Sequence, residues 1–127
     1  ERHDGADLMA GVDLTGQGDE IALVLMDLAR ADTGPRSLRL AEHLAGGINE
    51  QAGGLNRKPL RSAAFSVLKS PDIPSVLLEI GFLSSARDRE RIASAEWRLK
   101  AARGIADGLL LWAEDDSTRA SALRRRP

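Results

Sequence analysis

The segment PSVLLEIGFLSS, Pro74 to Ser85, places a single acid, Glu79, inside the most apolar run of the chain. Short apolar runs that include β-branched residues and are bounded by proline and glycine are typical of strands. The segment therefore predicts a strand over 75–79. A carboxylate at such a place is costly to bury unless it is paired, hydrogen-bonded or bound to a metal ion.

A second predicted strand lies directly upstream, in the segment AAFSVL at 63–68. Only about five residues separate the two strands, which is too few for the crossover that joins parallel strands. The strands at 63–68 and 75–79 are therefore predicted to be antiparallel neighbours.

Helical patterns surround these strands. The apolar spacing of Ile21, Val24, Leu25 and Leu28 is that of a helix face. Pro35 suits the first position of a second helix, and the pair Gly53-Gly54 suits its end. The predicted helices lie at 19–31, 36–52, 86–94 and 96–113. With two strands, they predict an α/β fold with the helices packed on the sheet, and the further strands that such a fold normally has are expected upstream of Glu1.

Composition limits the function. The chain has 127 residues, 43% apolar content and a net charge of −1, which suits one domain and gives no general attraction to nucleic acid or to anionic membranes. It has no cysteine, and no apolar run reaches the ~18 residues of a membrane span. Its two histidines, His3 and His43, are too few for a zinc site built mainly of imidazoles. Since the first residue is Glu rather than Met, the chain is expected to be a piece of a longer one.

Glu79 has two interpretations from the residues alone. It follows a predicted strand and precedes Gly81, which places it at the carboxyl end of the strand, where open α/β sheets carry their sites. It could therefore be catalytic. It could equally be a structural acid paired with one of three arginines, Arg61, Arg87 or Arg89.

The segment FSVLKSPDIPSVLLEIGFLSS, Phe65 to Ser85, resembles the C-terminal signature of the zinc-dependent N-acetylmuramoyl-L-alanine amidases of the amidase_3 type, which are bacterial cell-wall hydrolases. ERHDGADLMAGVDL at the start resembles a segment that follows the family's last histidine ligand, and Trp97 to Trp112 resembles its closing helix. The resemblance implies that 1–113 is the C-terminal part of a mixed-sheet catalytic domain and that 114–127 is a flexible tail. It also implies a periplasmic enzyme that cleaves peptidoglycan between N-acetylmuramic acid and L-alanine.

The resemblance assigns Glu79 the role of general acid and base beside a Zn²⁺ ion. The flanking Leu78 and Ile80 are expected to form an apolar wall that raises the proton affinity of the acid. The zinc ligands of the family, two histidines and a glutamate, are expected upstream of this chain, and neither His3 nor His43 matches them. The isolated chain is therefore expected to be inactive. It also departs from the family at Ser85, where the family has Asn.

Residues 13–31 resemble an insertion of the division amidases, in which a helix covers the zinc until an activator protein withdraws it. By this resemblance, Glu20 could reach the metal as an inhibitory ligand. Alternatively, Glu20 only stabilises the start of the helix at 19–31. Leu23 and Met26 lie off the main apolar face of that helix, which suits a partner protein.

A second class of function is a catalytically silent interaction module. In that interpretation, the helix at 19–31 binds a regulatory partner and Glu79 has no role in catalysis. A hydrolase without a metal is disfavoured because the chain has no cysteine and no Gly-x-Ser-x-Gly motif.

Overall fold

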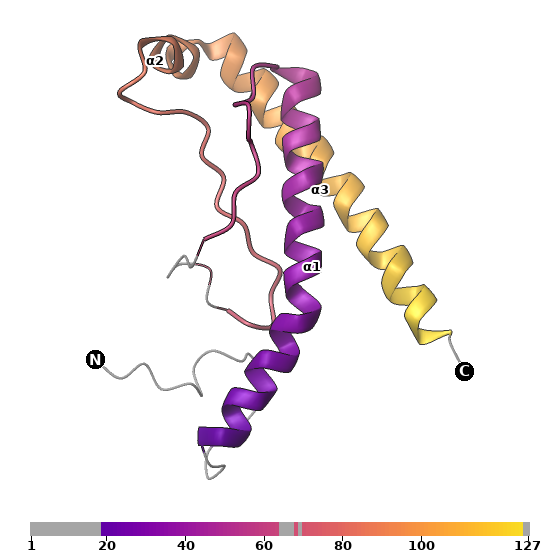
Figure 1. Cartoon of the computed structure of the whole chain (residues 1–127). Coiled ribbons are helices and arrows are strands. Elements are labelled where there is room, and N and C mark those ends of the chain that lie inside the picture. The colour runs from indigo at the N-terminus through magenta and orange to yellow at the C-terminus, as the bar shows by residue number, and fades with distance from the viewer. Residues whose placement is uncertain (1–18, 64–67, 69, 126–127) are drawn as a thin grey trace. The chain divides into compact units, whose positions relative to one another are not determined.

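The computed structural model describes residues 19–63, 68 and 70–125, which form three helices. Their bounds are α1 Asp19–Gln51, α2 Ala86–Ala93 and α3 Ala95–Arg124 (Figure 1). None of these residues belongs to a strand, so the predicted α/β fold with a mixed sheet is wrong for the part of the chain that the structure describes. No described helix combines the length and the apolar character that crossing a membrane requires.

The predicted strand over 75–79 is an irregular segment. A strand is stable only when its backbone groups pair with a neighbouring strand. Its predicted neighbour, 63–68, falls mostly outside the described residues, at 64–67. The backbone N–H of Ser75 is satisfied instead by a side chain of α1, since it donates a 2.9 Å hydrogen bond to the hydroxyl of Ser37. Apolar β-branched composition alone therefore did not produce a strand here.

Helix α1 is continuous through Pro35, although the sequence predicts separate helices at 19–31 and 36–52. Proline removes one helical hydrogen bond and crowds the preceding turn. An ion pair spans this point, with Arg36 Nη1 3.3 Å from Asp32 Oδ2. The predicted end of the helix is confirmed: Gly53 has φ +64° and Gly54 has φ +73°, which is the left-handed conformation that glycine adopts most easily.

The described residues form two compact units, and α1 contributes to both. The first unit contains α1 up to Leu38 together with residues of 63–76. In it, Thr33 is buried and its hydroxyl lies 2.7 Å from the carbonyl oxygen of Pro71, to which it donates. On the same helix Met26 is buried, whereas Leu28 is 67% exposed. The apolar face predicted for 19–31 is therefore not the face that is buried.

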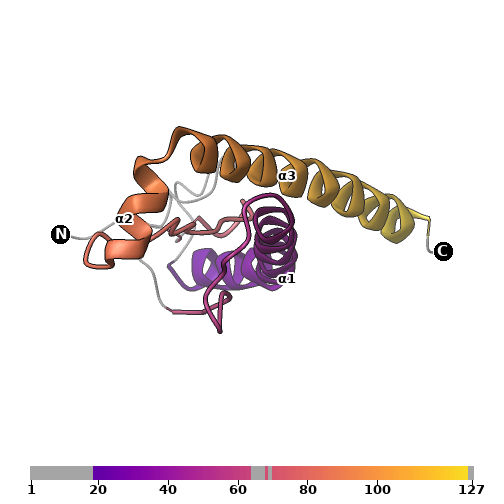
Figure 2. The same ribbon diagram turned by 90° about the horizontal axis from the view of Figure 1, so that it is seen from above.

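The second unit contains 39–62 and 77–127, and its core is the crossing of α1 and α3 (Figure 2). The helices meet at three buried glycines, Gly47, Gly104 and Gly108. A Cβ atom added to Gly104 would lie 2.5 Å from the carbonyl oxygen of Gly47, and one added to Gly108 would lie 2.6 Å from that of His43. Any side chain at these positions would therefore meet backbone. The apolar side chains buried in this unit are those of Leu40, Leu44, Ile48 and Ala101.

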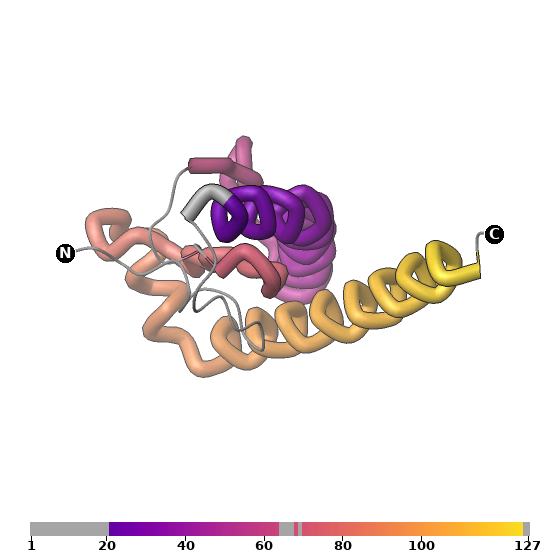
Figure 3. Tube along the Cα trace, turned by 90° about the horizontal axis from the view of Figure 1, so that it is seen from below, coloured from indigo at the N-terminus to yellow at the C-terminus, as the bar shows by residue number. Residues whose placement is uncertain are grey.

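Helices α2 and α3 are consecutive and share the residue between them, Ser94 (Figure 3). Its backbone N–H closes α2 by donating to the carbonyl oxygens of Glu90 and Arg91, and its hydroxyl accepts from the N–H of Trp97 at the start of α3. Ser94 thus closes the end of α2 and caps the start of α3. Helix α3 extends to Arg124, beyond the predicted end at 113; the separation of 114–127 as a flexible tail stays a prediction.

Candidate functional site

The segment that carries Glu79 is fixed to α2 on its C-terminal side. The backbone N–H of Phe82 donates to Asp88 Oδ2 at 3.1 Å, and Arg89 Nη1 donates to the carbonyl oxygen of Leu83 at 2.6 Å. The N–H of Asp88 in turn donates to the hydroxyl of Ser85, which caps the start of α2. These bonds hold the backbone that follows Glu79 in one place.

Gly81 lies at the point of closest approach between this segment and α2. A Cβ atom there would lie 3.1 Å from Asp88 Cβ and 3.1 Å from Ile92 Cδ1. Its φ angle is not positive, since Gly53 and Gly54 are the glycines with positive φ in the described chain. Gly81 therefore serves the close packing of this segment against α2 rather than a sharp turn.

Glu79 is exposed, and so are its neighbours Leu78 and Ile80, at 39% and 50%. The apolar wall expected around the carboxylate is therefore absent from this part of the structure. Among the described residues, Glu79 forms no ion pair with Arg61, Arg87 or Arg89 and takes part in no hydrogen bond through its side chain. Its carboxylate is accessible to solvent and to a bound molecule.

The other predicted site residues do not join Glu79. The side chain of Glu20 and all of His3 fall outside the described residues. His43, which matches none of the zinc ligands of the family, is partly buried on α1, with Nε2 3.9 Å from Asp115 Oδ2. The part of the chain that the structure describes contains no group of three or more histidine, aspartate or glutamate side chains that could hold a metal ion.

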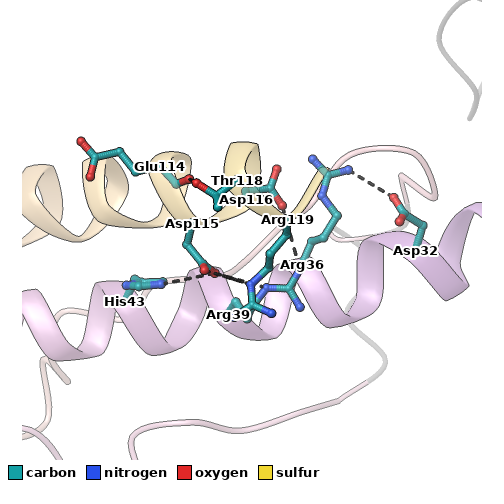
Figure 4. A network of polar contacts seen from close by, with 9 residues as sticks. All are labelled: Asp32, Arg36, Arg39, His43, Glu114, Asp115, Asp116, Thr118 and Arg119. Carbon is teal, nitrogen blue, oxygen red and sulfur yellow. Dashed lines mark hydrogen bonds and ion pairs between the residues drawn. The ribbon is translucent and has the colours of Figure 1, made fainter. Parts of the chain in front are cut away.

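A charged cluster on α1 and α3 surrounds Asp115 (Figure 4). Both carboxylate oxygens of Asp115 accept from Arg119 Nε at 2.9 Å, and Arg39 Nε lies 3.6 Å from Asp115 Oδ2. The hydrogen bond from Arg119 is the main reason that the pKa of Asp115 is lowered, and the same contact raises the pKa of Arg119. Because cations surround this acid, the cluster is an ion-pair network between helices and not a metal site.

A basic depression adjoins the segment that carries Glu79. We use this name for the open hollow of about 680 Å³ lined by Asn56, Arg57, Lys58, Arg61 and Phe82. Three of the five lining side chains are cations. Sequence reasoning considered Arg61 only as a partner of Glu79 and missed the depression. The signal that could have revealed it is the density of positive charge in NRKPLR, at 56–61.

Comparison with known proteins identifies relatives among cell-wall amidases. The chain is 36% identical to N-acetylmuramoyl-L-alanine amidase AmiA of Escherichia coli over 110 residues, which are 87% of this chain and 38% of AmiA. It is 30% identical to N-acetylmuramoyl-L-alanine amidase AmiC of Neisseria meningitidis over 112 residues, which are 86% of this chain and 26% of that protein. A third relative, N-acetylmuramoyl-L-alanine amidase LytC of Bacillus subtilis, is 38% identical over 72 residues, or 57% of this chain and 14% of LytC. No solved structure matches the chain.

The chain spans less than half the length of each of these relatives. The profile of one family, described as N-acetylmuramoyl-L-alanine amidase, matches residues 6–110. That range includes the Phe65–Ser85 segment and the whole of α1 and α2. The resemblance seen in the sequence is thereby confirmed, and the chain belongs to the N-acetylmuramoyl-L-alanine amidase family.

Proposed function

We propose that the protein containing this chain hydrolyses the amide bond between N-acetylmuramic acid and the L-alanine of the peptidoglycan stem peptide. Membership of the amidase family supports the reaction type. The observation that carries the proposal for this chain is Glu79, an exposed acid that has no side-chain partner among the described residues and lies on a segment that α2 fixes in place. By the same family argument, the protein acts in the periplasm and serves in cell division.

Glu79 acts in this proposal as the general base and then the general acid. Its carboxylate takes a proton from the attacking water and then donates it to the nitrogen of the leaving L-alanine. Such a group must lie within hydrogen-bonding reach of the water. The solvent accessibility of Glu79 and the hydrogen bonds that fix Phe82 and Leu83 support this role, because an accessible acid on an anchored segment meets its substrate in one orientation.

The family resemblance implies Zn²⁺, which would polarise the scissile carbonyl and activate water. The described residues of this chain do not fit a zinc site, since they bring no three ligand side chains together. No role as a ligand of the catalytic metal is therefore assigned to any side chain that the structure describes. For the same reason we expect residues 1–127 alone not to hydrolyse peptidoglycan.

The test is Glu79→Gln in the full-length protein, because glutamine keeps the size of the side chain but cannot take up a proton. We expect release of stem peptides to fall by about 10²- to 10⁴-fold, the usual contribution of a general acid–base group. Zinc content and thermal stability should not change. The matched control is Glu90→Gln, an exposed glutamate on α2 of the same unit, which should keep the full rate. A Glu79→Gln enzyme with a normal rate would remove Glu79 from the reaction.

A second candidate function, regulation by a partner protein, is favoured by the N-terminal part of α1. Its exposed aliphatic side chains are Ile21 at 51%, Leu23 at 56%, Val24 at 63% and Leu28 at 67%. Exposed apolar residues that gather on one helix are typical of protein-binding surfaces. We propose that this helix binds an activator, and that Glu20 acts as an inhibitory metal ligand in the closed state. The extreme form of this proposal is a chain that only binds partners and catalyses nothing.

Two substitutions separate these roles in the full-length protein. Glu20→Gln should raise the basal rate if Glu20 holds the site closed. Leu23→Lys with Leu28→Lys should leave the basal rate unchanged and abolish any activation by whole periplasmic extract. Met26 is unsuitable for this test because it is buried. An unchanged basal rate in Glu20→Gln would return Glu20 to a purely helix-stabilising role, and full activation of the double lysine variant would exclude this surface.

A further inference from the structure

The basic depression has no charge partner of its own in the part of the chain that the structure describes. Arg57, Lys58 and Arg61 are all exposed, and within 19–63, 68 and 70–125 none of them takes part in an ion pair. This contrasts with Arg39 and Arg119 in the same unit, which both contact Asp115. Three like charges around one hollow repel one another, so an anion that enters it relieves this repulsion as well as gaining its own contacts.

The lining residues define which anion fits. Guanidinium groups present paired N–H donors that match the two oxygens of a carboxylate. Phe82 is 48% exposed and offers an apolar surface beside these donors, and the Asn56 amide can both donate to and accept from a peptide group. A peptide that carries carboxylates and aliphatic carbon can contact the guanidinium groups, the Phe82 ring and the Asn56 amide at once. A small inorganic anion uses only the charge.

The depression is close to the proposed catalytic acid along the chain. Phe82 follows Glu79 by three residues, so their Cα atoms are at most about 11 Å apart, at 3.3–3.6 Å per residue. A peptide bound beside Glu79 covers the same distance with about three residues when it is extended. Carboxylates two or three residues beyond the scissile amide can therefore reach the depression while the amide lies at Glu79.

We propose that the basic depression binds the free carboxylates of the peptide part of the substrate and so selects acidic stem peptides over amidated ones. This inference rests on the proposed function, because it takes Glu79 as the place where the amide is cleaved. It adds a specificity site formed by Arg57, Lys58 and Arg61, with Phe82 as its apolar wall.

The experiment measures binding without turnover. Full-length protein carrying Glu79→Gln is titrated in a calorimeter with a muramyl peptide whose carboxylates are free, and with the same peptide in which they are amidated. We expect the free form to bind about tenfold more tightly, as one lost charge-assisted contact would predict. Arg57→Gln with Arg61→Gln should remove this preference, and Arg57→Lys with Arg61→Lys should keep part of it.

The matched control is Arg103→Gln, an exposed arginine of α3 outside the depression that forms no ion pair within the described residues. It should keep the full preference, and equal thermal midpoints should show that all variants are folded. Equal binding of the two peptides, or a preference that survives the double glutamine substitution, would overturn the inference. Displacement of the peptide by an equal concentration of inorganic phosphate would do the same, since the site would then recognise charge alone.

The two proposals fail in different ways. If the full-length protein with Glu79 intact hydrolyses the muramyl amide but shows no preference for free carboxylates, the depression is not a specificity site and the proposed function stands. If the preference is present in calorimetry but no hydrolysis occurs, the proposed function is wrong and the binding site stands.

Discussion

Adding one methyl group at Gly47 should destabilise the protein, whereas adding it at the neighbouring Gly46 should stabilise it. Both residues are inside α1, so Gly→Ala brings the same gain in helix propensity at each. The surroundings differ. A Cβ atom on Gly46 would meet nothing within 4 Å, whereas one on Gly47 would lie 3.1 Å from Gly108 N and 3.2 Å from Gly104 C, with Gly104 O closer still. The atoms it meets are backbone, which cannot rotate away.

The magnitude follows from this geometry. Ordinary carbon contacts have their optimum at about 3.5–4.0 Å, so α1 and α3 must separate by roughly 1 Å to admit the methyl group. Overpacking of this kind costs about 1–3 kcal/mol, and a rigid backbone places the cost near about 3 kcal/mol. The gain in helix propensity is about 1 kcal/mol. Gly47→Ala should therefore lose about 2 kcal/mol of unfolding free energy, and Gly46→Ala should gain about 1 kcal/mol.

Chemical and thermal unfolding of the full chain, followed by circular dichroism, measures both values. Because the helix-propensity gain is common to the two variants, their difference of about 3 kcal/mol isolates the overpacking cost. At about 4 °C per kcal/mol, their midpoints should differ by roughly 12 °C. Gly104→Ala should behave like Gly47→Ala, because its Cβ would lie 2.5 Å from the Gly47 carbonyl oxygen. A Gly47→Ala protein as stable as Gly46→Ala would show that the two helices do not approach this closely.

Two further predictions concern charge and the helix interior. Since the pKa of Asp115 is lowered in the folded chain, mainly by Arg119, its contribution to stability is present above its unfolded pKa of about 3.9 and is lost as pH falls through the folded value. Asp115→Asn should therefore be less stable than the parent near neutral pH and lose less stability on acidification; parallel acid unfolding curves would exclude this contribution. Pro35→Ala should raise the unfolding free energy by about 2 kcal/mol. Removing a proline from a helix interior stabilises the folded chain by about 3 kcal/mol, whereas the greater conformational freedom of the unfolded chain lowers the unfolding free energy by about 1 kcal/mol. A loss of stability instead would show that α1 breaks at Pro35, as the sequence predicts.

The helices were predictable where a local signal decides their ends. Ser85 and Ser94 each cap a helix by accepting a hydrogen bond from the backbone N–H three residues later in the sequence. Gly53 follows the end of α1 with a positive φ angle that other residues adopt with difficulty. The irregular conformation of 75–79 was not predictable in this way, because an apolar segment becomes a strand only by pairing with a neighbour that can be distant in the sequence. The prediction that the helix breaks at Pro35 was wrong, because proline is disfavoured, but not forbidden, inside a helix.

The family was predictable from the sequence, because the motif around Glu79 is continuous in the chain. The close crossing of α1 and α3 was not, since the spacing of Gly104 and Gly108 acquires meaning only when Gly47 faces them. The basic depression was missed for a similar reason. Its cations lie together in the sequence, but Phe82, which completes its wall, comes from a segment about 20 residues later.

Ser94 has a mechanical consequence for the acid at position 79. It is the one residue between α2 and α3, and its backbone angles, φ −72° and ψ 120°, fix the direction of α2. The eight residues of α2 span about 12 Å, so a rotation of about 10° at Ser94 would displace the far end of α2 by about 2 Å. Hydrogen bonds with Asp88 and Arg89 of α2 hold the backbone of Phe82 and Leu83 against this helix. A change in these backbone angles would therefore move the segment that follows Glu79 without contacting the acid itself, which lies fifteen residues before Ser94.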